Sequence, residues 1–115
     1  MGLSVLAMLG AKLRTGETWR RGAALLGKKL PLWSKPRGSI DFIYWYWGTR
    51  ASRVYGDELA LGWNASLGQA LLPNQRVEGL AQGSWDPVGA WGETSGRVAT
   101  TSLAILALQE AAVSR

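Results

Sequence analysis

The side chains that most often perform enzyme chemistry are largely missing from this sequence. Its 115 residues include no cysteine and no histidine, which excludes thiol nucleophiles, histidine bases, disulfides and zinc sites built from those ligands. The remaining candidates for general acid and base chemistry are the carboxylates of Asp41, Asp57, Asp86 and Glu93. Isolated acids beside glycine, proline or a helix start usually cap helices or shape turns. The sequence therefore favours a protein without catalytic residues, cofactor or metal site.

A second candidate for chemistry is the aromatic run at residues 42–47. Ring faces attract cations, so Tyr44, Trp45 and Trp47 could line a ligand cavity. Successive side chains on a helix are about 100° apart, so the whole run cannot face one cavity. Tyr44 and Trp47, three residues apart, would share a face. We expect the run to pack between helices, with a ligand-lining role for one or two of these rings as the alternative.

Hydrophobic periodicity, glycine and proline predict five helices joined by loops. The predicted helices cover residues 4–12, 18–30, 42–55, 58–72 and 98–113. Thr15 or Thr18 can cap the second helix, which Pro31 ends, and Pro73 ends the fourth. The first and last helices are apolar on nearly every side, which is typical of buried helices. The apolar stripe of the fourth helix is Trp63, Leu67 and Leu71.

The third helix has an alternative, because a short apolar run such as residues 42–47 could also form a strand. We favour a helix because residues 48–53 continue without a turn signal, and because Asp41 suits a helix cap. The fold class is therefore all-α, in a single domain of residues 1–115. A match between residues 4–9 and 104–109 indicates helical-hairpin repeats with a period of about 50 residues.

The glycine-rich loop at residues 74–96 carries a family resemblance. The loop resembles the repeat motif of terpenoid cyclases, in which Gln is followed after three residues by Gly, any residue and Trp. The matching residues here are Gln75, Gly79, Gly83 and Trp85. The sequence departs from the motif because Leu80-Ala81-Gln82 stand between the two glycines. Further matching segments are Tyr44-Trp45-Tyr46-Trp47-Gly48-Thr49, Asp86-Pro87, Trp91-Gly92-Glu93, Gly96-Arg97-Val98 and Thr100-Thr101-Ser102-Leu103-Ala104. Together they are similar to bacterial prenyltransferase and squalene-oxidase repeat proteins, relatives of squalene–hopene cyclase.

The resemblance implies a partial α/α toroid in which the motif residues are structural. Gln can satisfy open helix ends, glycine permits a sharp turn, and Trp covers the junction with a large apolar face. We expect Asp86-Pro87 to form a turn. The acid motif Asp-x-Asp-Asp of the cyclases is missing, as are the Cys and His of the prenyltransferases' zinc site and the Cys of the thioester proteins.

The size of the chain suggests an incomplete ring. A full toroid needs about five or six hairpins, whereas the predicted helices make about two and a half. The chain could be the C-terminal piece of a longer toroid, close its ring as a homo-oligomer, or collapse into a small bundle.

Charge is unevenly distributed along the chain. The net charge is +5, and residues 1–40 hold eight basic residues against one acid, a balance of +7. The charges are spread over helical faces without a nucleic-acid motif, so we expect a solvated surface and no nucleic-acid partner. The sequence shows no transmembrane segment and no signal peptide, which favours a cytoplasmic or peripheral membrane location.

Three functions are compatible with these features. The first is a non-catalytic cyclase-like repeat that acts as an interaction or scaffold module. The second is an isoprenoid-binding or squalene-cyclase-like protein whose catalytic acid motif lies outside this chain. The third is a basic surface module that binds anionic lipid or nucleic acid.

Overall fold

The computed structural model describes residues 16–113, and that part of the chain consists of helices and loops without a strand. The helices are α2 (Glu17–Lys28), α3 (Phe42–Tyr55), α4 (Asp57–Leu71), the short 3-10 helix η2 (Leu72–Asn74) and α5 (Gly92–Val113). The predicted all-α class is confirmed. The helix predicted at residues 4–12 lies outside the described residues.

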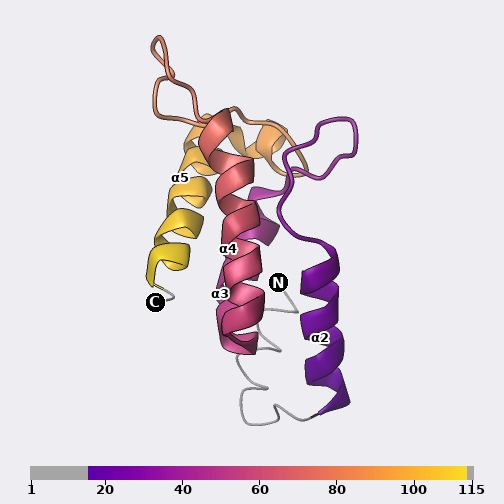
Figure 1. Ribbon diagram of the computed structural model, residues 1–115. Helices are drawn as coiled ribbons and strands as arrows, with labels where there is room; N and C mark the ends of the chain where they lie inside the picture. Colours follow the sequence, from indigo (N-terminus) through magenta and orange to yellow (C-terminus); the bar gives the residue numbers. More distant parts are fainter. Residues whose placement is uncertain (1–15, 114–115) are drawn as a thin grey trace.

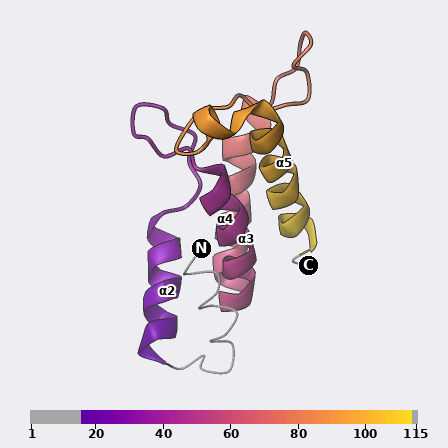
Figure 2. The same ribbon diagram turned by 180° about the vertical axis from the view of Figure 1, so that it is seen from behind.

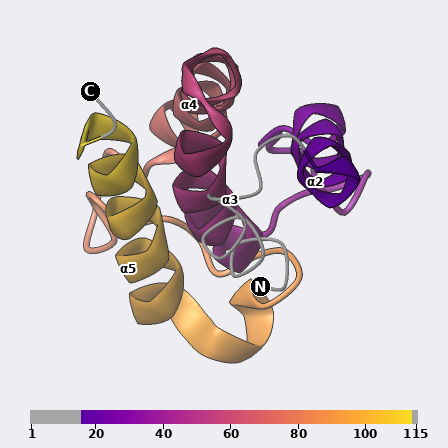
Figure 3. The ribbon, with the colours of Figure 1, turned by 90° about the horizontal axis from the view of Figure 1, so that it is seen from below.

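Consecutive helices run in opposite directions, and α3 is the central one. Figure 1 shows α3 and α4 as a tight antiparallel hairpin, with α2 and α5 on either side of it. The same arrangement is seen from behind in Figure 2 and end-on in Figure 3, where α3 lies between α2 and α5. The long loops at residues 29–41 and 72–91 both lie at one end of the molecule (Figures 1 and 2). We call this the loop end.

The predicted limits of α3 and the cap at Asp41 are confirmed. The Asp41 carboxylate accepts a hydrogen bond from the backbone N–H of Tyr44 at 2.9 Å, which satisfies one of the free donors at the helix start. Helix α4 begins one residue earlier than predicted, at Asp57, and Pro73 lies within the 3-10 turn that follows it.

Helix α2 begins without the predicted threonine cap. Gly16 precedes it and provides no side-chain hydrogen bond, while Thr18 lies inside the first turn. Thr15 is outside the described residues. The acidic side chain of Glu17 instead lies near the positive end of the helix dipole.

Helix α5 begins six residues before its predicted start and is interrupted once. Gly96 has φ 87° and ψ 175°, which is not helical and is open almost only to glycine. The first turn of α5 is therefore separate from the rest of the helix. The part after Gly96 corresponds to the helix predicted at residues 98–113.

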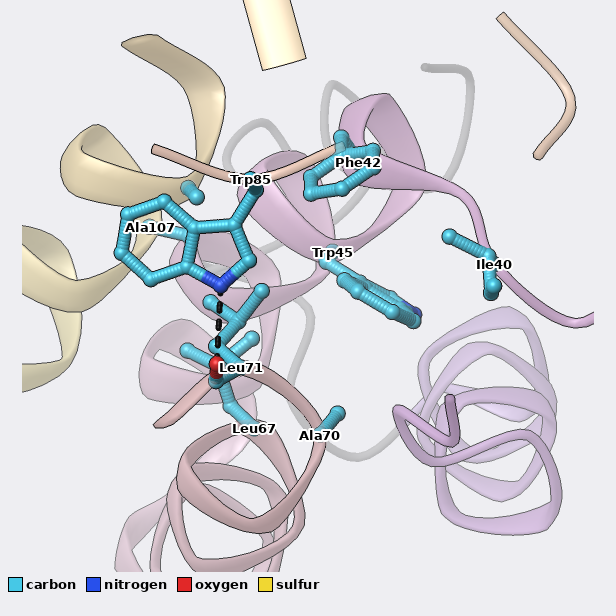
Figure 4. Close-up of a cluster of buried hydrophobic side chains, with 9 residues drawn as sticks. Ile40, Phe42, Trp45, Leu67, Ala70, Leu71, Trp85 and Ala107 are labelled. Atoms are coloured by element: carbon cyan, nitrogen blue, oxygen red, sulfur yellow. Dashed lines mark hydrogen bonds between the residues drawn. The ribbon is translucent and has the colours of Figure 1, made fainter. Parts of the chain in front are cut away.

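The main core lies at the junction of α3, α4 and α5 beneath the loop end (Figure 4). The side chains of Trp45, Leu67, Leu71 and Trp85 are at most 1% exposed there. Burying each large apolar side chain contributes about 1.5–3 kcal/mol, so this cluster stabilises the joint between the hairpin and α5. The predicted stripe of α4 is confirmed as a core face.

A second cluster joins α2 to the other end of the hairpin and contains Leu26, Ala51 and Trp63. The indole N–H of Trp63 donates to Thr49 Oγ1 at 2.9 Å, so this buried polar atom is satisfied. The ring of Trp63 lies against Gly48, where a methyl group would be only 2.2 Å from it. The absence of a side chain at Gly48 thus allows α3 and α4 to approach closely.

Helix α5 has an inner and an outer side. Thr100, Ala104 and Ala107 are 1% exposed and face α3, whereas Ile105 and Leu106 are 44% and 43% exposed. The prediction that this helix is buried on most sides is therefore wrong for its outer side. The reason is its position at the edge of the described helices, where no further helix covers it (Figure 3).

Candidate functional site

Trp85 joins the end of α4 to the start of α5. Its indole N–H donates to the carbonyl of Leu71, in the last turn of α4, at 2.8 Å (Figure 4). Its backbone N–H donates to Thr101 Oγ1 at 3.1 Å, and its carbonyl accepts from Thr100 Oγ1 at 2.9 Å. One buried residue thus satisfies an open helix end and fixes the loop to the next helix. Both threonines belong to residues 100–104, one of the segments that carry the family resemblance.

Gln75 does not reach a helix end, contrary to its predicted role. Its side-chain amide donates to the carbonyl of Gly83 at 3.0 Å and closes the loop on itself. Asn74 bonds the α4 carbonyl of Ala70 at 2.9 Å in its place. Gly79 and Gly83 have φ of 75° and 85°, the left-handed conformation that the predicted sharp turn requires.

Asp86 forms the predicted turn and also an ionic cluster that the sequence did not predict. The N–H of Val88 donates to the Asp86 carbonyl at 2.9 Å, which closes the turn. Its carboxylate lies 2.9 Å from the guanidinium of Arg97 and 3.7 Å from that of Arg76. Arg97 also donates to Ser84 Oγ at 2.8 Å. No local pattern predicts this cluster, because its partners come from opposite ends of the loop.

Trp91 differs from Trp85 in its environment. It is 56% exposed, whereas Trp85 is 1% exposed, so only one of the two motif tryptophans covers the helix junction. Trp91 stands immediately before α5 and leaves a large apolar surface at the loop end.

Within the aromatic run, Tyr44 connects α3 to α4 and to the end of α2. Its ring packs edge-on against Trp63 at 5.5 Å, and its hydroxyl donates to the carbonyl of Lys29 at 2.9 Å. Burial, with a smaller contribution from the charge of Asp41, raises the pKa of Tyr44 to about 12. Tyr44 therefore stays neutral and holds the end of α2 against α3.

The other two candidates of the run lie in different surroundings. Trp45 is 1% exposed within the main core, beside Phe42. Trp47 is half-buried and packs with Tyr46 and the guanidinium of Arg50, 5.1 Å from its ring centre. Tyr44 packs against the core cluster that contains Trp45, whereas the ring of Trp47 contacts Tyr46 and Arg50.

The described residues line two open cavities whose walls do not include these three rings. One, at the loop end, has a volume of about 350 Å³ and polar walls. The other, of about 500 Å³, lies between α2 and the turn that joins α3 to α4. Its more apolar lining includes Ala23, Leu30, Tyr55 and Leu59.

The four carboxylates considered for acid and base chemistry have separate places in the fold. Asp41 caps α3 and Asp86 belongs to the ionic cluster, while Asp57 and Glu93 stand in the first turns of α4 and α5. Within residues 16–113, no three acidic side chains gather in a way that could hold a metal ion.

No helix in the described part of the chain has the length and apolar character needed to cross a bilayer. Residues 16–113 therefore form an all-helical fold in which α3 and α4 make a hairpin. No protein-family model matches the chain, and no curated protein or solved structure matches it either.

Proposed function

We propose that this chain is a non-catalytic helical-hairpin module that binds another helical hairpin. The observation that carries the proposal is the outer side of α5, where Val98, Ile105 and Leu106 are exposed. The other exposed residues along this side are Ser102, Gln109 and Ala112, so no charged group interrupts it. Exposed and uncharged apolar surface of this kind is typical of an interaction site.

The position of α5 in the fold supports this function. Helices α3 and α4 form a hairpin, whereas α5 packs with its inner side on α3 and α4 and is followed by no further helix among the described residues. In stacked hairpin proteins, each helix buries its second apolar side against a neighbouring repeat. The outer side of α5 corresponds to the surface that such a neighbour would cover.

The terpenoid-cyclase-like identity is part of this proposal. Its support is the connection at Trp85, which ties the end of one hairpin to the first helix of the next through Leu71, Thr100 and Thr101. A residue that connects successive hairpins is what the resemblance implies for this position. The proposal assigns the loop a structural role and assigns recognition to α5.

We infer that a second copy of this chain can occupy the surface. Two α5 helices can meet around a twofold axis, so that each covers the apolar residues of the other. Although the chain carries a net charge of +5, this contact places no like charges together because the outer side of α5 is uncharged.

Cysteine crosslinking tests this arrangement directly, because the chain has no cysteine of its own. Gln109→Cys places a single thiol on the outer side of α5, and Lys28→Cys places one on the exposed end of α2 as the matched control. A short bis-maleimide should yield a covalent dimer mainly from Gln109→Cys, and adding Ile105→Glu should suppress it. Equal yields from the two cysteine variants would refute a contact through α5.

The apolar cavity between α2 and α4 favours isoprenoid binding as a second candidate function. Its volume of about 500 Å³ and its mainly apolar walls, with Asp57 and Glu58 also in the lining, suit a flexible apolar chain that ends in a polar group. Under this second candidate function, the proposed site is at Leu30, Tyr55 and Leu59 rather than at the aromatic run.

Gly62 offers a sharp test of that second function. It lines the cavity, and a methyl group there would meet no atom within 4 Å, so the Cβ of a larger side chain would enter open space. Farnesol binding, measured by protein fluorescence, should persist in Gly62→Ala and disappear in Gly62→Phe. Loss in Trp47→Ala alone would move the site to the aromatic run, and no saturable binding by the wild type would exclude this function.

A further inference from the structure

The polar cavity at the loop end is built from two loops that are distant in sequence. Trp33 and Lys35 line it from the first loop, and Asn74, Arg76 and Glu78 line it from the second. With a volume of about 350 Å³, it falls in the range of cavities that hold small molecules.

The backbone around the cavity is held in place by hydrogen bonds. The N–H of Ala90 donates to the carbonyl of Ile40 at 3.0 Å and joins the two loops. Arg76 exchanges backbone hydrogen bonds with the other side of its own loop, to Ser84 at 2.8 Å and from Gly83 at 2.7 Å. The cavity is therefore formed before any ligand arrives, which reduces the ordering that binding requires.

The guanidinium of Arg76 has hydrogen-bonding capacity left for a ligand. Asp86 is its only ion-pair partner among the described residues, and their closest approach is 3.7 Å, longer than a hydrogen bond. The Asp86 carboxylate is already satisfied by Arg97 at 2.9 Å. Arg76, which has five N–H donors, can thus turn to a carboxylate in the cavity.

Two opposite charges on the cavity walls also lack a counter-ion. Within residues 16–113, neither Lys35 nor Glu78 takes part in an ion pair. The cavity therefore presents two cationic groups, Arg76 and Lys35, and two carboxylates: Glu78, which has no ion-pair partner among the described residues, and Asp86, which is paired with Arg97.

Trp33 supplies the apolar wall. Its ring packs edge-on against Phe42 at 5.8 Å and lies 6.2 Å from the ring of Trp45, so it is fixed on the main core. A rigid aromatic side chain provides contact area to a ligand with little loss of its own freedom.

We propose that this cavity binds a free α-amino acid with an apolar side chain. Arg76 and Lys35 hold its carboxylate, Glu78 holds its ammonium group, and Trp33 packs against its side chain. A simple anion would meet the charge of Glu78 and that of Asp86, which Arg97 offsets, and a simple cation would meet those of Arg76 and Lys35; a zwitterion matches both signs. The site shares no residue with the outer side of α5, so it stands or falls separately from the proposed interaction.

Titration with L-phenylalanine and its two half-molecules tests this inference. The half-molecules are 3-phenylpropanoate, which lacks the ammonium group, and 2-phenylethylamine, which lacks the carboxylate. Amide and indole NMR signals of the loop end should shift saturably with L-phenylalanine, and both half-molecules should bind at least about tenfold more weakly. Absence of saturable shifts up to about 10 mM L-phenylalanine, or equally tight binding of 3-phenylpropanoate, would overturn the proposal.

Charge-removing variants locate the site. Lys35→Gln and Glu78→Gln change exposed side chains and should leave the helical circular dichroism intact, while each weakens L-phenylalanine binding about tenfold. Lys28→Gln, also at an exposed lysine but outside the cavity, serves as the control and should bind as the wild type does. Equal affinity in all three variants would mean that any observed binding occurs elsewhere.

Discussion

At the residue scale, the loop end depends on side chains that bond partners far away in sequence. Trp85 bonds Leu71, 14 residues before it, and Thr100, 15 residues after it. The cap at Asp41 could be predicted because its partner is three residues away. The contacts of Trp85 and the cluster around Asp86 could not, since helix packing and not local spacing brings their partners together.

The first prediction concerns the indole N–H of Trp85. Trp85→Phe keeps an aromatic ring in the core but leaves the carbonyl of Leu71 without its donor, so we expect a loss of about 2 kcal/mol in the free energy of unfolding. Trp91→Phe, at an exposed position, is the matched control and should change this free energy by less than about 0.5 kcal/mol. Urea unfolding measures both, and equal effects would argue against the connecting role of Trp85.

The second prediction follows from the raised pKa of Tyr44. Because its pKa is about 12 in the folded protein and 10.0 ordinarily, the folded state favours the neutral phenol. This contribution to stability is complete below pH 10 and is lost as the pH rises toward 12. Tyr44→Phe has no ionisable group here, so it should lose less stability than the wild type between about pH 9 and about pH 11.

Urea midpoints at the two pH values, measured for both proteins, check this expectation. Tyr55, whose pKa is also raised by burial, is present in both proteins and does not affect the comparison. A wild type and a variant with the same drop in midpoint would show that Tyr44 ionises as freely in the folded state as in the unfolded state.

At the element scale, local sequence signals were sufficient for α3 and α4 and insufficient for the ends of α2 and α5: the cap at Asp41 and the lack of a turn signal decided α3, and periodicity decided α4. The stripe of Trp63, Leu67 and Leu71 recurs at every fourth residue, so its buried side could be read directly. In α5 nearly every side is apolar, so periodicity does not distinguish the inner side from the outer one. Only the packing on α3 makes that distinction.

The third prediction separates the two sides of α5 with one type of substitution. Ala104→Leu adds volume where α5 packs against the core, so we expect a loss of about 1–3 kcal/mol in the free energy of unfolding. Ala112→Leu adds the same volume at an exposed position and should leave this free energy unchanged within about 0.5 kcal/mol. Thermal or urea unfolding of the two variants checks the orientation of α5, and a reversed order would contradict it.

At the scale of the whole molecule, the three functions that are compatible with the sequence respond differently to salt. The chain carries a net charge of +5, so binding to an anionic lipid or nucleic acid would weaken steeply as salt increases. Association through the uncharged side of α5 should instead persist or strengthen, because salt screens the repulsion between the two positively charged copies. Isoprenoid binding in an apolar cavity should depend little on salt.

The central claim is that the outer side of α5 binds a second helical hairpin, and sedimentation velocity across a concentration series tests it most directly. We predict a reversible monomer–dimer equilibrium with a dissociation constant on the order of 100 µM in moderate salt, as expected for a small interface. The double variant Ile105→Glu/Leu106→Glu, with both changes at exposed positions, should keep its helicity and remain monomeric. A wild type that stays monomeric at millimolar concentration, or a double variant that dimerises equally well, would contradict the claim.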